Sequence, residues 1–194
     1  MVNPDEITDY NRTTRELEEF MVFAICVAGK NAHTTATILN VLFENAEYWR
    51  DYPFEYFAKS GSKFLKSNGI GCYNMRYKSI YTVWRNLRNN PGFLKTCTVD
   101  DLEEIHGIGP KTARFFIMHS RPNQRLAALD THILKELKAN GIKVPKSTPA
   151  AGKKYAELEQ EFIKLADAAC KSVADYDLEV WKKHRKKAFW PVSP

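Results

Sequence analysis

The sequence predicts an all-α fold that forms a single domain spanning residues 1–194. Apolar residues recur at the spacing of an amphipathic helix in one segment after another. No stretch sustains the alternation of apolar and polar residues that marks a half-buried strand. Glycine, proline and asparagine separate the periodic segments. The length of 194 residues is typical of one domain, or of two lobes that share a core.

The first half of the chain carries the most apolar helix. Residues 17–27 are apolar nearly all round, so we expect this helix at the centre of the fold, with Gly29 as its stop. A second helix is predicted over residues 33–44, with its apolar positions facing the first. Short helical turns are predicted over residues 53–66.

The remaining segments continue the helical pattern. Residues 77–87 carry an apolar stripe with basic residues on the opposite face, and the Asn-Pro-Gly sequence at 90–92 ends this helix. Thr98 has the position of an N-cap for a short helix with acidic residues in its first turn. Two long helices, with apolar positions over residues 158–169 and 173–181, close the pattern.

Composition and charge are those of a folded protein with a polyanionic partner. Hydrophobic residues make up 44% of the chain and charged residues 27%, which excludes disorder over the whole chain. The net charge of +6 and the isoelectric point near 9.1 favour nucleic acid as the partner. A basic tail at residues 182–194 either contacts phosphate groups or is a solvated helix end.

Membrane insertion, secretion and cofactor binding are not expected. The longest apolar run, residues 20–28, is about half as long as the roughly 20 residues of a membrane-spanning helix, and it lacks the flanks of a secretory signal. The four cysteines include no CxxC pair, so no zinc or iron–sulfur site is predicted. We therefore expect a cytoplasmic, nucleoid-associated monomer without a cofactor, or a protein of the host-cell cytoplasm if the source is viral.

The most informative stretch is a hairpin motif at residues 99–119. A short helix leads into Gly107, Ile108 and Gly109, and Pro110 then occupies the first position of the next helix, where proline is favoured. Glycines permit a tight turn with positive φ and leave backbone N–H groups uncovered. At a helix N-terminus such groups bind phosphate without reading sequence. An ordinary helix–turn–helix connection without a ligand is the alternative.

Two further residues have a chemical interpretation. Asp130 has the position of an N-cap for a helix over residues 131–139, and this is the alternative to any catalytic role. Backbone N–H groups at that position favour an ionised carboxylate, which can stabilise positive charge. Lys111 lies at the positive end of its own helix, which favours the neutral, nucleophilic amine. An amine beside a fixed anion suits cleavage of an N-glycosidic bond through an oxocarbenium-like state and a Schiff base.

These motifs resemble those of the helix–hairpin–helix DNA glycosylase superfamily, which includes endonuclease III and 8-oxoguanine glycosylase. The resemblance rests on residues 105–113 and 129–132, and on further patches at residues 23–31 and 69–78. It covers about residues 17–137 and implies the two-lobed all-α glycosylase fold. The four-cysteine iron–sulfur loop of the endonuclease III branch is absent, so the chain is more similar to the compact, cluster-free 8-oxoguanine glycosylases.

The resemblance also implies roles for individual residues. By this resemblance, Lys111 corresponds to the Schiff-base lysine of the family and Asp130 to its catalytic aspartate. The backbone carbonyls of the hairpin correspond to a site that can hold a monovalent cation. Residues 69–78 resemble the segment with the wedge that fills the space left by a flipped nucleotide; packing and helix capping are the alternative. In the strand-inserting loop, Gly29 and Lys30 replace usual asparagines. The residues expected to contact DNA are Lys30, Asn31, Tyr73, Asn74, Arg76, Lys78, Gly107, Ile108, Gly109 and His132.

Three functions remain open from the sequence. The first is a base-excision repair glycosylase with AP lyase activity, which acts on double-stranded DNA with a damaged or modified base through a lysine Schiff base. The second is a viral-type transferase that modifies hypermodified thymine on the same fold. The third is a non-catalytic DNA-binding module, against which Lys111 and Asp130 argue, since backbone binding requires neither residue.

Overall fold

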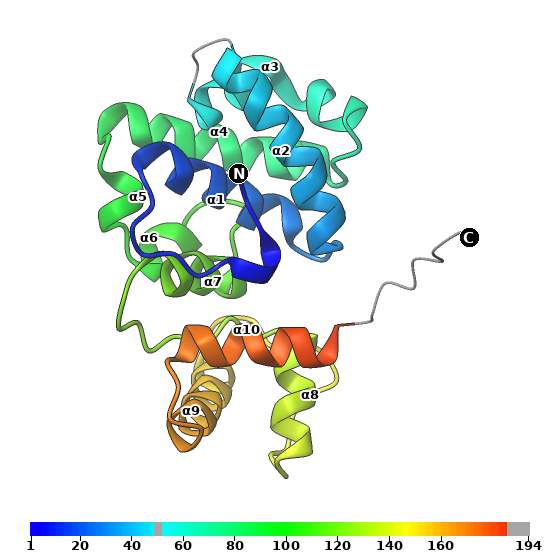
Figure 1. Cartoon of the computed structure of the whole chain (residues 1–194), viewed down its shortest axis with the longest axis vertical. Helices are drawn as coiled ribbons and strands as arrows, with labels where there is room; N and C mark the ends of the chain where they lie inside the picture. The colour runs from blue at the N-terminus through cyan, green and yellow to red at the C-terminus, as the bar shows by residue number, and fades with distance from the viewer. Residues whose placement is uncertain (49–51, 186–194) are drawn as a thin grey trace, which may run out of the picture.

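The structure is a computed structural model that describes residues 1–48 and 52–185, and within these residues it is helical without a strand (Figure 1). This confirms the predicted all-α class. The elements are η1 (Pro4–Glu6), α1 (Thr14–Val27), α2 (Ala32–Tyr48), α3 (Pro53–Ser67), α4 (Tyr73–Asn89), α5 (Phe93–Thr96), α6 (Val99–Glu103), α7 (Pro110–Ser120), α8 (Thr131–Ala139), α9 (Lys153–Ala168) and α10 (Val173–His184).

Local signals account for where most of these helices begin. Thr98 caps α6 as predicted, and its side chain forms a reciprocal capping box with Asp101. The short helical turns predicted over residues 53–66 correspond to α3, which consists of two short helical stretches that meet at a kink at Gly61, where φ is 81°. The short helix α5 was not predicted, since four residues are too few for a periodic pattern.

The first lobe consists of α1–α7 and is built around α1 (Figure 1). The side chains of Phe20, Met21 and Val22 are completely buried, and those of Phe23 and Ile25 nearly so. Helix α1 packs against α2, α3, α4 and α7, which confirms its predicted central position. A helix that is apolar on every side is stable only when neighbours surround it.

The second lobe consists of α8–α10, which form a separate group beside the first lobe in Figure 1. Its core includes Leu129, Tyr155, Leu158 and Phe162, each at most 1% exposed, and Met118 at the end of α7 packs with them. Because α7 contributes to both cores, it joins the lobes as well as linking them in sequence. Among the described helices, none has the length and apolar character needed to cross a membrane.

Polar contacts tie the two lobes together. His119 at the end of α7 is completely buried; its Nδ1 lies 2.7 Å from Thr8 Oγ1 and its Nε2 lies 3.2 Å from Asp177 Oδ2 on α10. The described beginning of the predicted basic tail packs against the protein, because Lys183 and His184 pair with Glu136 on α8. Residues 186–194 of that tail lie outside the described residues.

Candidate active site

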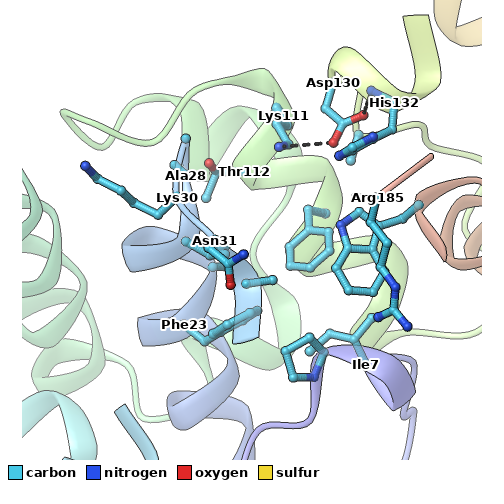
Figure 2. A pocket seen from close by; sticks show the side chains of 18 of the residues that line it. Ile7, Phe23, Ala28, Lys30, Asn31, Lys111, Thr112, Asp130, His132 and Arg185 are labelled. Carbon is cyan, nitrogen blue, oxygen red and sulfur yellow. Dashed lines mark hydrogen bonds and ion pairs between the residues drawn. The ribbon is translucent and has the colours of Figure 1, made fainter. Parts of the chain in front are cut away.

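A cleft with a volume of about 1190 Å³ separates the two lobes. The end of α1 and the loop that follows it form one wall, and the first turns of α7 and α8 form another (Figure 2). Helix α10 and the N-terminal segment complete the lining. The predicted site residues on the wall are Lys30, Asn31, Lys111, Asp130 and His132.

Lys111 and Asp130 meet in this cleft. The Nζ atom of Lys111 lies 3.5 Å from Oδ2 of Asp130, and the two side chains are 41% and 20% exposed (Figure 2). The other oxygen, Oδ1, accepts hydrogen bonds from the backbone N–H groups of His132 at 2.7 Å and Ile133 at 2.9 Å. Asp130 is therefore the N-cap of α8, as predicted, and still presents a second oxygen to the lysine.

The segment before Asp130 is held by buried polar groups that the sequence analysis did not single out. Glu159 on α9 accepts a hydrogen bond from the Ala127 N–H at 2.8 Å. Tyr155 accepts one from the Leu129 N–H at 3.0 Å and donates one to the Ala127 carbonyl at 2.8 Å. Burial raises the pKa of Tyr155, which keeps its hydroxyl protonated. The only available signal was a polar residue at the apolar positions of α9, which is too weak to assign a partner.

His132 lies beside Asp130 in the cleft. Its Nδ1 atom is buried and has no hydrogen-bond partner among the described residues. Burial lowers the pKa of His132, and the nearby Asp130 charge opposes that shift. The lowered pKa favours the neutral imidazole at neutral pH.

The hairpin between α6 and α7 is fixed by Gly107. Its φ is 89°, and a Cβ atom there would lie 2.5 Å from Ser79 Oγ, whose hydroxyl donates to the His106 carbonyl at 2.7 Å. Gly109, by contrast, has φ −100°, so the expected positive φ is wrong for this residue, and open space surrounds its Cα. The Ile108 side chain belongs to the core of the first lobe, and its N–H donates to the Ile105 carbonyl at 2.9 Å, so neither group is free for DNA.

The described residues hold no group of three or more His, Cys, Asp or Glu side chains that could bind a metal ion. The monovalent cation predicted at the hairpin depends on backbone carbonyls instead. Those of Ile105 and His106 already accept hydrogen bonds, from the Ile108 N–H at 2.9 Å and from Ser79. These contacts do not favour a cation there.

The opposite wall of the cleft comes from α10 and its neighbours. Trp181 and Asp177 lie one helical turn apart on α10, and both line the cleft. The guanidinium of Arg185 lies 4.8 Å from the Trp181 ring centroid, and the His33 ring lies 5.7 Å from it. Arg185 and His33 both pair with Asp5, and the hydrogen bond from His33 is the main cause that lowers the pKa of Asp5. The sequence analysis missed this wall.

A family model described as 8-oxoguanine DNA glycosylase matches residues 5–170. The chain belongs to this family. The match confirms the resemblance to the helix–hairpin–helix glycosylases and identifies the chain as an enzyme of the glycosylase class. A search of curated proteins found no relative that matches the chain.

Solved glycosylase structures share the fold. The 8-oxoguanine glycosylase/lyase of Methanocaldococcus jannaschii, in complex with a 15mer DNA containing 8-oxoguanine, has a TM-score of 0.71 at 21% identity over 93% of this chain and 86% of that one. The 8-oxoguanine DNA glycosylase of Thermotoga maritima has a TM-score of 0.69 at 22% identity over 95% and 88%. At these identities the likeness establishes the helical glycosylase architecture.

The predicted DNA-contacting loops of this glycosylase lie at the edge of the cleft. Tyr73 and Asn74 open α4 directly after Cys72, which is in the left-handed region with φ 52°. Neither residue lines the cleft, and Asn74 and Lys78 are exposed. The ammonium of Lys66 lies 5.5 Å from the Tyr73 ring centroid. The loop with Lys30 and Asn31 therefore lines the cleft, whereas Tyr73 and Asn74 lie outside it and the partly buried Tyr73 ring packs against the core of the first lobe.

The predicted exposed position of Arg76 is wrong. This residue is 3% exposed, and its guanidinium donates to the carbonyls of Gly71 at 2.7 Å and Ala28 at 2.9 Å. The helical pattern placed Arg76 opposite the apolar stripe of α4, but the loop after α1 covers that side of the helix. The guanidinium therefore binds backbone within the protein.

Proposed function

We propose that this chain is an 8-oxoguanine DNA glycosylase with AP lyase activity. It would excise 8-oxoguanine from double-stranded DNA and then cleave the strand through a Schiff base on Lys111. The observation that carries the proposal is the 3.5 Å distance between Lys111 Nζ and Asp130 Oδ2 in the cleft between the lobes. Membership of the 8-oxoguanine DNA glycosylase family supports the substrate. The neighbour from Methanocaldococcus jannaschii, which holds DNA with that base, supports it as well.

The first chemical step replaces the base by the lysine. After Nζ of Lys111 has lost a proton to water, its lone pair forms a bond to C1′ of the nucleotide, while Asp130 Oδ2, 3.5 Å from Nζ, stays ionised. The bond from C1′ to the base breaks, and its electron pair leaves with the base, which takes up a proton. The anchored carboxylate of Asp130 stabilises the positive charge that develops on the sugar.

The second step cleaves the strand. The nitrogen of Lys111 loses a proton, and its lone pair forms the C=N bond as the bond from C1′ to the ring oxygen breaks. The ring oxygen keeps that electron pair and takes up a proton, so that an open-chain Schiff base forms. Loss of a proton from C2′ then expels the 3′-phosphate, because the iminium group accepts the electron pair. Water finally hydrolyses the Schiff base and frees Lys111. Borohydride reduces the same intermediate to a stable amine, which makes it detectable.

The opposite wall of the cleft supports a purine as the excised base. Oδ2 of Asp177 is the oxygen that pairs with buried His119, which leaves Oδ1 for a ring N–H of the base. Trp181, whose ring also contacts Arg185 and His33, lines the cleft next to Asp177. In 8-oxoguanine N7 carries a proton, whereas in guanine N7 is an acceptor that a carboxylate would repel. Asp177 therefore has the chemistry to favour the oxidised base.

The DNA contacts proposed for this enzyme are of two kinds. The backbone N–H groups of Gly107 and Gly109, together with Lys30 and Lys78, would bind phosphates, and Tyr73 and Asn74 would fill the gap in the duplex. Phosphate binding releases counterions, so affinity for undamaged duplex should fall steeply with salt.

A trapping experiment tests the proposal. The protein is incubated with borohydride and a set of duplexes that are identical except for one position, which holds 8-oxoguanine, guanine, uracil or an abasic site. We expect a covalent adduct on the 8-oxoguanine and abasic duplexes and none on the guanine duplex. An adduct on uracil but not on 8-oxoguanine, or no adduct on any duplex, would overturn it.

A further inference from the structure

Arg76 connects two loops that are far apart in the sequence. Its Nη1 donates to the carbonyl of Gly71, in the turn before α4, at 2.7 Å. Its Nη2 donates to the carbonyl of Ala28, in the loop after α1, at 2.9 Å. Ala28 lines the cleft, whereas the turn lies outside it. One guanidinium therefore bonds to the cleft wall with one nitrogen and to the outer turn with another.

The arrangement is costly for folding. Arg76 is 3% exposed and forms no ion pair with a carboxylate among the described residues. Its Nε atom is buried and has no hydrogen-bond partner there. A buried charge that is only partly satisfied destabilises the folded state, so an apolar side chain of similar size would serve packing alone better. The guanidinium is therefore suited to a task that requires two donors at a fixed separation.

A second contact joins the same two loops. A Cβ atom placed on Gly71 would lie 3.0 Å from both Cε and Nζ of Lys30, so the Lys30 side chain lies against the turn. The turn itself is tight, because Cys72 is in the left-handed region and its carbonyl accepts the Arg76 N–H at 3.1 Å. The side chains of Arg76 on α4 and of Lys30 in the loop after α1 thus both contact the turn before α4.

We propose that Arg76 is a positioning residue that fixes the turn at residues 71–74 against the cleft-lining loop at residues 28–31. Tyr73 and Asn74 then enter the duplex at a set distance from the nucleotide held at Lys111 and Asp130. The proposal rests on the proposed function, since it assigns the turn to the gap in the DNA. Loss of Arg76 would leave Lys111 and Asp130 in place. The turn with Tyr73 and Asn74 would no longer be held at a fixed distance from them.

The chain offers a matched control in Arg121. Its Nη1 donates to the Cys97 carbonyl at 2.7 Å, its Nη2 donates to the Leu94 carbonyl at 3.0 Å, and its Nε is also buried without a partner among the described residues. Arg121 ties the segment around α5 to the end of α7 and does not line the cleft. It has the same chemistry without a connection to the DNA-facing loops.

The experiment compares excision from duplex and from single-stranded DNA under single-turnover conditions. The substrates carry 8-oxoguanine in the same strand, and the proteins are wild type, Arg76→Met, Arg76→Lys and Arg121→Met. Arg76→Met should lower the duplex rate about ten- to a hundredfold, which is the usual cost of a misplaced contact, and should leave the single-strand rate near wild type. Arg76→Lys should recover part of the loss, and Arg121→Met should leave the ratio of the two rates unchanged.

A second readout requires no catalysis. All four proteins are bound at saturation to a duplex with a tetrahydrofuran abasic analogue opposite 2-aminopurine, whose fluorescence reports unstacking around the gap. Arg76→Met should reduce the fluorescence change, and Arg121→Met should not. Equal losses on both DNA forms, or equal effects of Arg76→Met and Arg121→Met, would overturn the positioning role. If wild type excises no 8-oxoguanine, the proposed function fails while the fluorescence still tests Arg76. If Arg76→Met does not fold, Arg76→Lys decides both readouts.

Discussion

Lys111 and Arg114 lie one turn apart on α7 and are paired in opposite ways. Lys111 is 41% exposed and lies 3.5 Å from a single carboxylate, that of Asp130. Arg114 is 16% exposed and bonds to two carboxylates, Glu103 at 2.5 Å and Glu159 at 2.9 Å. The difference in pairing distinguishes a charged group that can react from one that stabilises the fold. A reacting amine must be able to leave its partner, whereas a structural guanidinium is most useful when its donors are satisfied.

The two pairs are mechanically connected. Glu159 Oε1 accepts hydrogen bonds from Arg114 and from the Ala127 N–H, three residues before Asp130. The ion pair between Arg114 and Glu159 therefore holds the segment that leads to Asp130, the partner of Lys111. Rigid support beneath an accessible reacting group is the arrangement that preorganised catalysis requires. The comparison predicts that substitutions at Lys111 affect chemistry alone, and those at Arg114 affect stability first.

The largest expected effect is that of Lys111→Gln. Glutamine preserves the helix but has no nucleophilic amine, so borohydride trapping and strand cleavage should disappear. Affinity for a duplex with an abasic analogue should stay near wild type, because the Lys111 ion pair is exposed. Gel analysis of the trapped product measures adduct formation and strand cleavage, and a binding titration measures the affinity. A variant that still forms the adduct would assign the role to another amine.

The next effect is that of Asp130→Asn. The amide oxygen can still accept from the N–H groups of His132 and Ile133, so we expect a stability loss of about 1 kcal/mol or less. The single-turnover rate should fall about a hundred- to a thousandfold, because a fixed charge opposite the sugar is lost. Quenched-flow excision measures that rate. An unchanged rate would reduce Asp130 to a helix cap.

Removal of the Arg114 ion pairs should lower the stability of the folded protein. Arg114→Met leaves Glu103 and Glu159 without their cation, and we expect a loss of about 1–3 kcal/mol, less than for a fully buried pair because these side chains retain some exposure. Urea unfolding measures it. Arg125→Met is the control: its pair with Asp167 is exposed, so we expect a smaller loss of stability than for Arg114→Met. Equal losses of stability in the Arg114→Met and Arg125→Met variants would contradict a structural role for the Arg114 ion pairs.

Glu18 extends the comparison to a buried carboxyl that accepts a hydrogen bond from a backbone N–H. Burial raises the pKa of Glu18 from 4.5 to about 7, against the hydrogen bond that it accepts from the Phe54 N–H. Between these pH values the unfolded chain binds fewer protons than the folded one, so stability falls as pH rises from 4.5 to about 7. Below this range the carboxyl is protonated in both states, and the penalty is absent.

Glu18→Gln should therefore stabilise the protein at pH 8 by about 1–3 kcal/mol and change little at pH 4.5. Urea unfolding at the two pH values measures the difference. The exposed Glu161→Gln variant serves as the control, since its partner Lys164 is also on the surface. A Glu18→Gln stability curve parallel to that of wild type would show that Glu18 is ionised in the folded protein.

Motifs formed by neighbouring residues could be read from the sequence. The helical periodicity of α1, the caps at Thr98 and Asp130, and the turn at Gly107 depend on contacts within a few residues, which a single sequence displays. The candidate pair Lys111 and Asp130 was found because each begins a helix, a position with a known electrostatic consequence. What could be predicted was therefore which residues are candidates for the reacting groups.

The tertiary structure decided which side chains surround those groups. Arg76 has the sequence pattern of an exposed residue, but its acceptor at Ala28 is 48 positions away and covers it. Asp177 and Trp181 become cleft residues only when α10 packs across α7, and Glu159 reaches Ala127 only through the packing of α9. Local interactions specify the helices and their ends, because they act within one or two turns. Burial and pairing depend on which helices meet, which only the packed core determines.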